Sequence, residues 1–572
     1  MNPGPAVLGP GDGARTTPAP VPDSPAAGTV RWPRRHRRWL LPLAVLALLA
    51  EMAFAMVSTA VRQTPTIDEP VYAGTAVVYV QQHSLRYNPE HPPLGKLLIG
   101  SGLALARPHL DPGFTGGQTA LGRHLLYESG NNPGRLLLWA RLPVIVLTLL
   151  CGLVVFAFAR DLAGPRGGLV ALALYAFSPD LIAHGSLATL DVPAAAFLLT
   201  SVWLVWRARR RPGLCLLPAA VALGAALATK MSVLAAVPVV LCLVVGSVWA
   251  AQGGRASGAR GRARRLGVGV ASAAGVALVA VAVVWAAYLA VDPRLRWTAP
   301  AGVPDVRGTR GLIAGRLPFP RPYQDGMRIQ FGFEYATWEG FLLGRHYRGS
   351  LWYYLPVALL IKTPLGMLAL WSAGAASLVA VPRLRAAAPY VLVCPAVLLG
   401  AAMLGSRDLG VRYAIFLPVF LAVAAASVTV WRRRWSQPVT AALAAFVAVS
   451  SLLTYPYYLP YSNEAFGGPA GTRLRLHDSN VDWGQDLGRL ADRLRTRYPG
   501  ERVWLVYKGS GVPAFYGIRA SDPRKVPPAS VHGLLVVSDS AAAKAEGRLA
   551  ELLAGSRPVD DVGHSITLYR RP

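Results

Sequence analysis

The stretch RRHRRWLLPLAVLALLAEMAFAMVSTAV, residues 34–61, decides the class of protein that this chain represents. Four arginines and a histidine precede an apolar run over residues 39–61. About 20 apolar residues are enough for a helix to cross the hydrocarbon core of a bilayer. A cleavable secretory signal has a shorter apolar core. We therefore expect residues 39–61 to stay in the membrane as a spanning helix with its basic end in the cytoplasm.

The composition of the whole chain agrees with this expectation. Of its 572 residues, 53% are hydrophobic and 15% are charged, and the mean hydropathy is +0.38. This profile is typical of a polytopic membrane protein. A formal charge of +29 would fit nucleic-acid binding, but the arginines form short clusters between apolar runs, as membrane topology requires. The four cysteines all lie in apolar runs, which argues against a disulfide framework or a zinc site.

Further apolar runs predict an α-helical polytopic fold with about eleven transmembrane helices. With these spans, every basic cluster between them falls on the side of the N-terminus, which the positive-inside rule places in the cytoplasm. An odd number of spans puts the C-terminus outside, and the large outer loops are 62–135 and 291–350. The predicted spans are 39–61, 136–159, 168–187, 192–207, 213–230, 231–251, 266–290, 351–381, 388–405, 410–430 and 437–455.

The two ends of the chain differ from this membrane part, residues 39–455. Residues 1–38 begin with a segment rich in Pro, Gly, Ala and Ser and are predicted to be a disordered cytoplasmic tail. Residues 456–572 are polar and predict a junction followed by a small extracytoplasmic α/β domain. Its expected strands are 502–509, 533–540 and 564–571, and its expected helices are 486–498 and 541–555.

The acids and lysines of the membrane part gather on the predicted outer side, which topology alone does not explain. Asp68 and Glu69 precede Pro70, a residue suited to the first turn of a helix. Either acid could simply cap an amphipathic helix lying at the interface. Nearby, NPEHPPLGK (88–96) brings Glu90 and His91 before a Pro-Pro pair. Its Lys96 could meet a phosphate or could be a snorkelling interfacial lysine.

Several of these motifs resemble the protein O-mannosyltransferase family and its relatives, which are glycosyltransferase family 39-like membrane enzymes. HPPLGKLL follows an upstream Asp-Glu pair in one long first outer loop. The resemblance continues in order along the chain and covers residues 39–490, without the inserted domains of the eukaryotic members. The further segments that carry it are SPDLIAHGSLATLDVPAAAFLL (178–199), LATKMSVL (227–234), LWYYLPVALLIKTPL (351–365), RDLGVRYAIFLP (407–418) and YSNEAFGGPAGTRLRLHDSNVDWGQDL (461–487).

The resemblance implies a GT-C fold and a polyprenyl-phosphate sugar as donor. A lipid-linked phosphate needs cations at membrane depth, where a charge is costly unless it is paired or functional. The predicted phosphate-binding residues are Lys96, Lys230, Lys362 and Arg412. The family's first-loop acid matches Asp68, which we expect to be the general base, with Glu69 supporting it or positioning the acceptor and Asp191 sharing the site. Attack opposite the phosphate would invert the anomeric centre.

A metal site is a further option at this loop. Glu90 and His91 are suitable ligand types for a divalent ion, and Glu90 matches a metal-site glutamate of the related aminoarabinose transferases. No third ligand at a fitting spacing accompanies them, so the sequence names no certain cofactor.

The expected partners are the lipid bilayer, the polyprenyl-phosphate sugar and an acceptor hydroxyl of protein, lipid or glycan, with no nucleic acid. The sugar is a hexose, with mannose as one option. The Arg-, Ala- and Gly-rich composition is typical of a GC-rich bacterial genome, and the expected place is the cell membrane. Two other functions compete: a transporter or lipid flippase, which would more typically show paired broken helices in two related halves, and a membrane-anchored binding protein that works through its C-terminal domain.

Overall fold

A computed structural model describes Met1 and residues 34–253 and 258–572 of the chain. The predicted tail, residues 1–38, lies almost wholly outside the described residues. Helices dominate from Arg34 to Thr454, and a small sheet follows near the C-terminus. The predicted class, a helical polytopic membrane protein with a small α/β domain, is confirmed.

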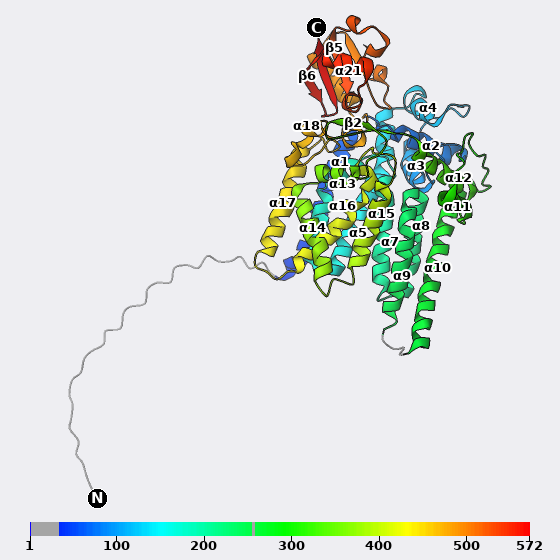
Figure 1. Ribbon diagram of the computed structural model, residues 1–572, viewed down its shortest axis with the longest axis vertical. Coiled ribbons are helices and arrows are strands. Elements are labelled where there is room, and N and C mark those ends of the chain that lie inside the picture. The colour runs from blue at the N-terminus through cyan, green and yellow to red at the C-terminus, as the bar shows by residue number, and fades with distance from the viewer. Residues whose placement is uncertain (2–33, 254–257) are drawn as a thin grey trace. The chain divides into compact units, whose positions relative to one another are not determined.

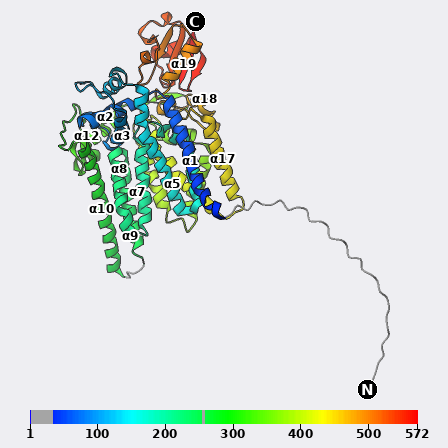
Figure 2. The same cartoon turned by 180° about the vertical axis from the view of Figure 1, so that it is seen from behind.

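The helical part runs from α1 to α18 (Figure 1). In Figure 1 and from behind in Figure 2, α5, α7, α8 and α10 run along one another, and α2 and α3 lie at one end of them. The helices are α1 (Arg34–Arg62), α2 (Glu69–Gln82), α3 (Leu94–Ala106), α4 (Gln118–Arg123), α5 (Pro133–Ala176), α6 (Pro179–Gly185), α7 (Asp191–Ala208), α8 (Pro212–Thr229), α9 (Val237–Ala251), α10 (Ala259–Val291), α11 (Gly308–Arg316), α12 (Arg321–Gly332), α13 (Tyr354–Lys362), α14 (Leu365–Ala380), α15 (Cys394–Met403), α16 (Phe416–Ala425), α17 (Ser436–Thr454) and α18 (Gly468–Thr472).

Helix α5 is two helices joined at Gly164. This glycine has a φ of 77°, which ends the first leg. The second leg folds back on the first, as two contacts between them show. The Tyr175 hydroxyl donates to the Thr148 carbonyl at 2.8 Å, and a Cβ on Gly168 would lie 3.1 Å from the Phe156 carbonyl oxygen. The first leg corresponds to the predicted span 136–159, and the second leg together with α6 corresponds to the predicted span 168–187.

The predicted number of eleven spans is not confirmed by length and hydropathy. Within the described residues, six helices pass as membrane spans, and a seventh span results if α13 and α14, bent by 118°, are counted as one. Three shorter apolar helical segments, Leu94–Ala106, Pro389–Met403 and Phe416–Val430, fall below the length of a span. The number is smaller than eleven because the two legs of α5 are counted as one span and because several expected spans form helices that are too short.

Helix α2 is buried more completely than an interfacial amphipathic helix would be. Ten of its fourteen residues are buried, because α3 and α4 pack against it. The approach of α4 is close: a Cβ on Gly122 would lie 2.3 Å from the Pro70 carbonyl oxygen. The predicted helix after Pro70 is therefore present, but as a packed element that fixes the position of Asp68 and Glu69 at its start.

The C-terminal part is a five-stranded sheet with helices on both faces. The strand order is β4-β3-β5-β7-β6, with β4, β3 and β5 parallel and β7 antiparallel to both β5 and β6. The register pairs Val506 with Val537 and Val536 with Leu568. The elements are α19 (Leu487–Arg497), β3 (Val503–Val506), β4 (Ala520–Ser521), β5 (Gly533–Ser538), α20 (Asp539–Ala542), α21 (Gly547–Ala554), β6 (Arg557–Val562) and β7 (Ile566–Arg571).

A second, two-stranded sheet lies in the loop 291–350. Its strands, β1 (Glu339–Leu342) and β2 (Arg345–Arg348), form an antiparallel hairpin. The side chain of Arg348 in this hairpin donates to Glu546 of the C-terminal part at 3.1 Å. The hairpin thus contacts the C-terminal part at the residue directly before α21.

Candidate active site

The acid at the start of α2 is paired with an arginine from far along the chain. Asp68 Oδ2 accepts a hydrogen bond from Arg412 Nη1 at 2.6 Å. The Asp68 side chain is 26% exposed and that of Arg412 is 12% exposed. Asp68 makes no side-chain capping bond to α2 in the described structure. Its carboxylate therefore binds Arg412 rather than capping the first turn of α2.

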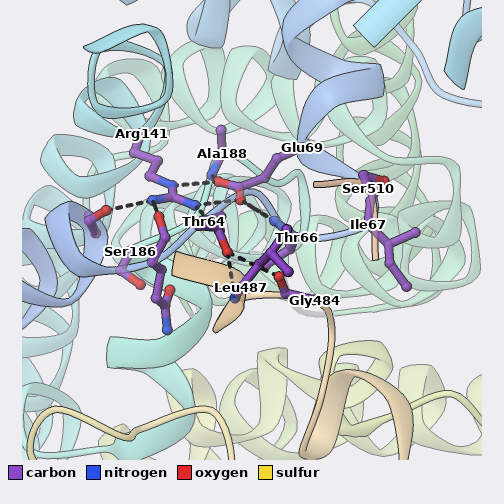
Figure 3. Close-up of polar contacts among 12 residues, drawn as sticks. Thr64, Thr66, Ile67, Glu69, Arg141, Ser186, Ala188, Gly484, Leu487 and Ser510 are labelled. Atoms are coloured by element: carbon purple, nitrogen blue, oxygen red, sulfur yellow. Dashed lines mark hydrogen bonds and ion pairs between the residues drawn. The ribbon is translucent and has the colours of Figure 1, made fainter. Parts of the chain in front are cut away.

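The neighbouring Glu69 has a different environment (Figure 3). Its carboxylate is fully buried and takes two hydrogen bonds from Arg141, from Nε and Nη2, each at 2.7 Å. The backbone N–H groups of Thr66 and Ala188 each donate to it at 2.9 Å. Burial by itself would raise the pKa of Glu69, but the Arg141 charge and these donors hold that pKa below its usual range. Glu69 thereby anchors the loop that carries Asp68, which agrees with a supporting role, whereas its enclosed carboxylate does not favour a direct contact with the acceptor.

Asp191 and Lys230 form the second ion pair of the site. Asp191 is the first residue of α7, and Lys230 follows the last residue of α8. Their side chains are 6% and 15% exposed. The pair joins the ends of two helices that pack along each other.

Three cations converge on the ring of Tyr413. The ring centroid lies 5.1 Å from the guanidinium carbon of Arg412, 5.4 Å from Lys230 Nζ and 5.8 Å from the guanidinium carbon of Arg407. Such distances fit cation–π contacts. Arg412 also lies 4.4 Å from the ring centroid of Trp483. The aromatic rings thus hold positive charge at the end of the bundle where Asp68 and Asp191 lie.

Arg407 is a site residue that the sequence analysis did not single out. It stands five residues before Arg412, in the same motif RDLGVRY. Its Nη2 donates to Gln330 Oε1 at 2.9 Å, and Glu334 lies 3.8 Å away. The repeated arginine in a loop between two apolar helices was the signal that could have found it.

Two of the four predicted phosphate-binding residues are instead internal. Lys96 is fully buried, and its ammonium donates to the backbone carbonyls of Asn88 and His91, each at 2.7 Å, and to Asn88 Oδ1 at 3.1 Å. Lys362 is also fully buried and donates to the Leu459 carbonyl at 2.6 Å. Since three acceptors match the three N–H groups of Lys96, this geometry does not favour its predicted contact with phosphate.

Lys362 likewise has its partners within the protein. Besides Leu459 it donates to the Asn480 carbonyl at 3.1 Å, and it pairs with Asp180 at 3.3 Å. The prediction that it binds phosphate therefore has no support from its surroundings. Its role in this geometry is to tie the end of α13 to α6 and to the segment before α19.

The suggested metal pair, Glu90 and His91, is not completed by a third ligand. Glu90 Oε1 accepts from Gln118 Nε2 at 2.8 Å, and the His91 ring packs edge-on against Tyr72 with 5.8 Å between centroids. Among residues 34–253 and 258–572, no group of three or more His, Cys, Asp or Glu side chains could hold a metal ion. Glu90 and His91 alone therefore do not complete a metal site.

The chain matches a known family over part of its length. A model of the dolichyl-phosphate-mannose-protein mannosyltransferase family matches residues 44–292. Over this part of the chain, the match confirms the resemblance drawn from the motifs. The matched segment contains Asp68, Asp191 and Lys230 and ends before Arg407 and Arg412. Among curated proteins, none matches the chain.

Several solved structures are similar to this chain. ArnT from Cupriavidus metallidurans in the apo state is 15% identical, with a TM-score of 0.47, and the alignment covers 92% of this chain and 97% of that one. The Archaeoglobus fulgidus oligosaccharyltransferase in the apo form is 12% identical, with a TM-score of 0.41 and coverage of 81% and 59%. The S. cerevisiae Pmt1-Pmt2 complex bound to the sugar donor is 18% identical, with a TM-score of 0.35 and coverage of 44% and 34%.

Proposed function

We propose that this protein transfers a hexose, with mannose as the first candidate, from a polyprenyl-phosphate donor to a hydroxyl group of a protein, lipid or glycan on the outer face of the membrane. The observation that carries the proposal is the Asp68–Arg412 pair, in which a partly exposed carboxylate lies beside a cation cluster. A transferase of this kind needs a base for the acceptor and cations for the phosphate, and this pair brings one of each together.

The donor phosphate would bind at Arg412, Lys230 and Arg407, around Tyr413. Guanidinium groups bind phosphate oxygens through two parallel hydrogen bonds, and a lysine adds a point charge. These three side chains are partly exposed, at 12%, 15% and 21%. Their exposure sets them apart from Lys96 and Lys362, whose ammonium groups are enclosed.

Asp68 would act as the general base. An acceptor hydroxyl is a weak nucleophile and gains from losing its proton to a carboxylate as it attacks. Arg412 donates a hydrogen bond to this carboxylate. A bound phosphate would compete for Arg412 and free Asp68 for the acceptor, so the base would become available only when the donor is in place.

The transfer step follows from this arrangement. The acceptor oxygen forms a bond to the anomeric carbon on the face opposite the phosphate, and the bond from that carbon to the phosphate oxygen breaks. Asp68 takes the acceptor proton, and the cations hold the departing polyprenyl phosphate. One displacement inverts the anomeric configuration and requires no covalent sugar–enzyme intermediate. Asp191, held by Lys230, would keep that lysine directed at the phosphate.

The substitution Asp68→Asn tests the proposal. With purified protein and polyprenyl-phosphate mannose, transfer to an envelope extract should fall by about 100-fold or more, because general base catalysis contributes about that much. Asp305→Asn is a matched control, since Asp305 is an 80% exposed acid of the loop 291–350, and its activity should equal that of the wild type. Full activity of Asp68→Asn would refute the base, and wild-type protein that moves the lipid without transferring sugar would favour a flippase.

A further inference from the structure

The C-terminal sheet presents its carboxyl-end edge to a segment of its own chain. Beyond the ends of the parallel strands β3 and β5 stand Lys508 and Ser540, at the edge where open α/β sheets usually bind ligands. Here the edge is taken by residues 477–487, which we call the clamp segment. Lys508 pairs with Asp478 of this segment, and Ser540 Oγ donates to the Asp482 carbonyl at 2.8 Å.

Ser540 makes two further bonds to the clamp segment. Its Oγ accepts from the Asp478 backbone N–H at 2.8 Å, and its own N–H donates to Asp482 Oδ2 at 3.2 Å. Asp478 and Asp482 are both buried. Burial by itself would raise the pKa of Asp478, but nearby positive charge, most of all the Lys508 ammonium, holds that pKa well below the usual range. The C-terminal part therefore holds the segment through the Lys508–Asp478 ion pair and three hydrogen bonds of Ser540.

The same segment holds the loop that presents Arg412. The Ser479 hydroxyl donates to the Leu409 carbonyl at 2.7 Å, and the Val411 N–H donates to Asn480 Oδ1 at 3.0 Å. These contacts fix the backbone directly before Arg412. Trp483, two residues after Val481 in the clamp segment, supplies the ring on which the Arg412 guanidinium lies.

The clamp segment also holds the loop that presents Asp68. The Ile67 N–H donates to the Trp483 carbonyl at 3.0 Å, and the Thr64 N–H donates to the Gln485 carbonyl at 3.0 Å. Ser510, in the loop after β3, donates to the Ile67 carbonyl at 2.8 Å, and Figure 3 shows this side of the network. Both members of the Asp68–Arg412 pair are thus attached, through their neighbours, to one segment.

We infer that the clamp segment and the C-terminal sheet form a positioning device for the reaction, and that Lys508, acting through Asp478, is the positioning residue that sets the distance between Asp68 and Arg412. This inference rests on the proposed function. Lys508 is 30% exposed and Asp478 is 8% exposed, so loss of the lysine would leave a nearly enclosed carboxylate without its cation. The segment would then shift, and with it the two loops that it holds.

Lys508→Met tests the inference, with Lys508→Arg and Lys525→Met beside it. We expect Lys508→Met to lower the transfer rate by up to about 100-fold, the loss that a displacement of about 1 Å can bring. Lys508→Arg keeps the charge and should restore most of the rate. Lys525→Met makes the same substitution at an exposed lysine of the same domain and should leave the rate unchanged.

A second pair of variants separates positioning from general loss of stability. Asp478→Asn keeps the shape at a position with a φ of 54°, which Asn tolerates, and should lower the rate as much as Lys508→Met does. The double variant should lose no more than either single one, because both act through one contact. Losses that multiply, or a full rate in Lys508→Met, would overturn the inference. A wild type without any transfer would instead overturn the proposed function.

Discussion

Asp68 and Glu69 are adjacent acids with opposite surroundings, and the geometry of a helix start explains why. Successive side chains on a helix point about 100° apart, so one carboxylate faces Arg412 and the other faces Arg141. Glu69 is enclosed by donors, whereas Asp68 keeps an exposed side. At the scale of single residues, the motif resemblance could assign the base to Asp68, but the sequence could not predict the two arginine partners, because both lie far along the chain from these acids.

The enclosed ion pair of Glu69 with Arg141 predicts that Glu69→Gln will destabilise the protein. The amide cannot neutralise Arg141, which would remain buried with its charge unpaired. Breaking one partner of a buried pair typically lowers the free energy of unfolding by about 3–5 kcal/mol. We expect a marked fall in the temperature at which purified protein loses its monodisperse peak in size-exclusion chromatography. Asp68→Asn should leave that temperature nearly unchanged, and equal temperatures for both variants would contradict the assignment.

At the scale of elements, the membrane helices follow from hydropathy, whereas the packing at the end of the bundle where Asp68 and Asp191 lie does not. Most of the helices were predicted because apolar length is a local property of the sequence. The edge strands β4 and β6 were missed: β4 has two residues, and β6 contains a proline and two acids, which weaken the strand pattern. The burial of α2 was also missed, since it depends on contacts with α3 and α4 that no local pattern reveals.

The packing of α3 on α5 gives a prediction for this scale. A Cβ on Gly102 would lie 1.9 Å from the Trp139 carbonyl oxygen and 2.9 Å from Pro143 Cγ. Gly102→Ala should therefore push α3 away from α5 and lower the free energy of unfolding by about 1–3 kcal/mol. Gly275→Ala in α10 is the matched control, because nothing lies within 4 Å of the added atom, and helix propensity there favours alanine by up to about 1 kcal/mol. Thermal unfolding in detergent compares the two, and an unchanged Gly102→Ala protein would show that α3 is free to move.

At the scale of the whole molecule, charge is divided between the two ends of the helical bundle. Arginines from separate predicted inner loops meet neighbouring loops at one end: Arg209 donates to the Ala386 carbonyl at 3.1 Å, and Arg166 donates to Gln437 at 3.2 Å. The pairs of Asp68 and Asp191 lie at the other end, together with the contacts of the C-terminal sheet. The sequence could predict this division, because each apolar span reverses the side on which the next loop lies. It could not predict which cations meet there, because the enclosure of Lys96 and the partial exposure of Arg407 depend on what the fold places around them.

The division predicts the orientation of the protein in the membrane. Since positively charged loops stay in the cytoplasm, the C-terminal sheet should face outward. Thr496→Cys in α19 and Arg433→Cys in the loop before α17 are both at exposed positions, and each can be placed in a protein whose native cysteines are replaced by alanine. A membrane-impermeant maleimide added to intact cells should label the Thr496→Cys protein and should label the Arg433→Cys protein only after the membrane is opened. The reverse pattern would place the Asp68–Arg412 pair on the cytoplasmic side, where the donor would have to be an inward-facing lipid-linked sugar. Labelling of both proteins in intact cells would place Thr496 and Arg433 on the same side of the membrane. That result would contradict an odd number of crossings between these two positions, where α17 lies.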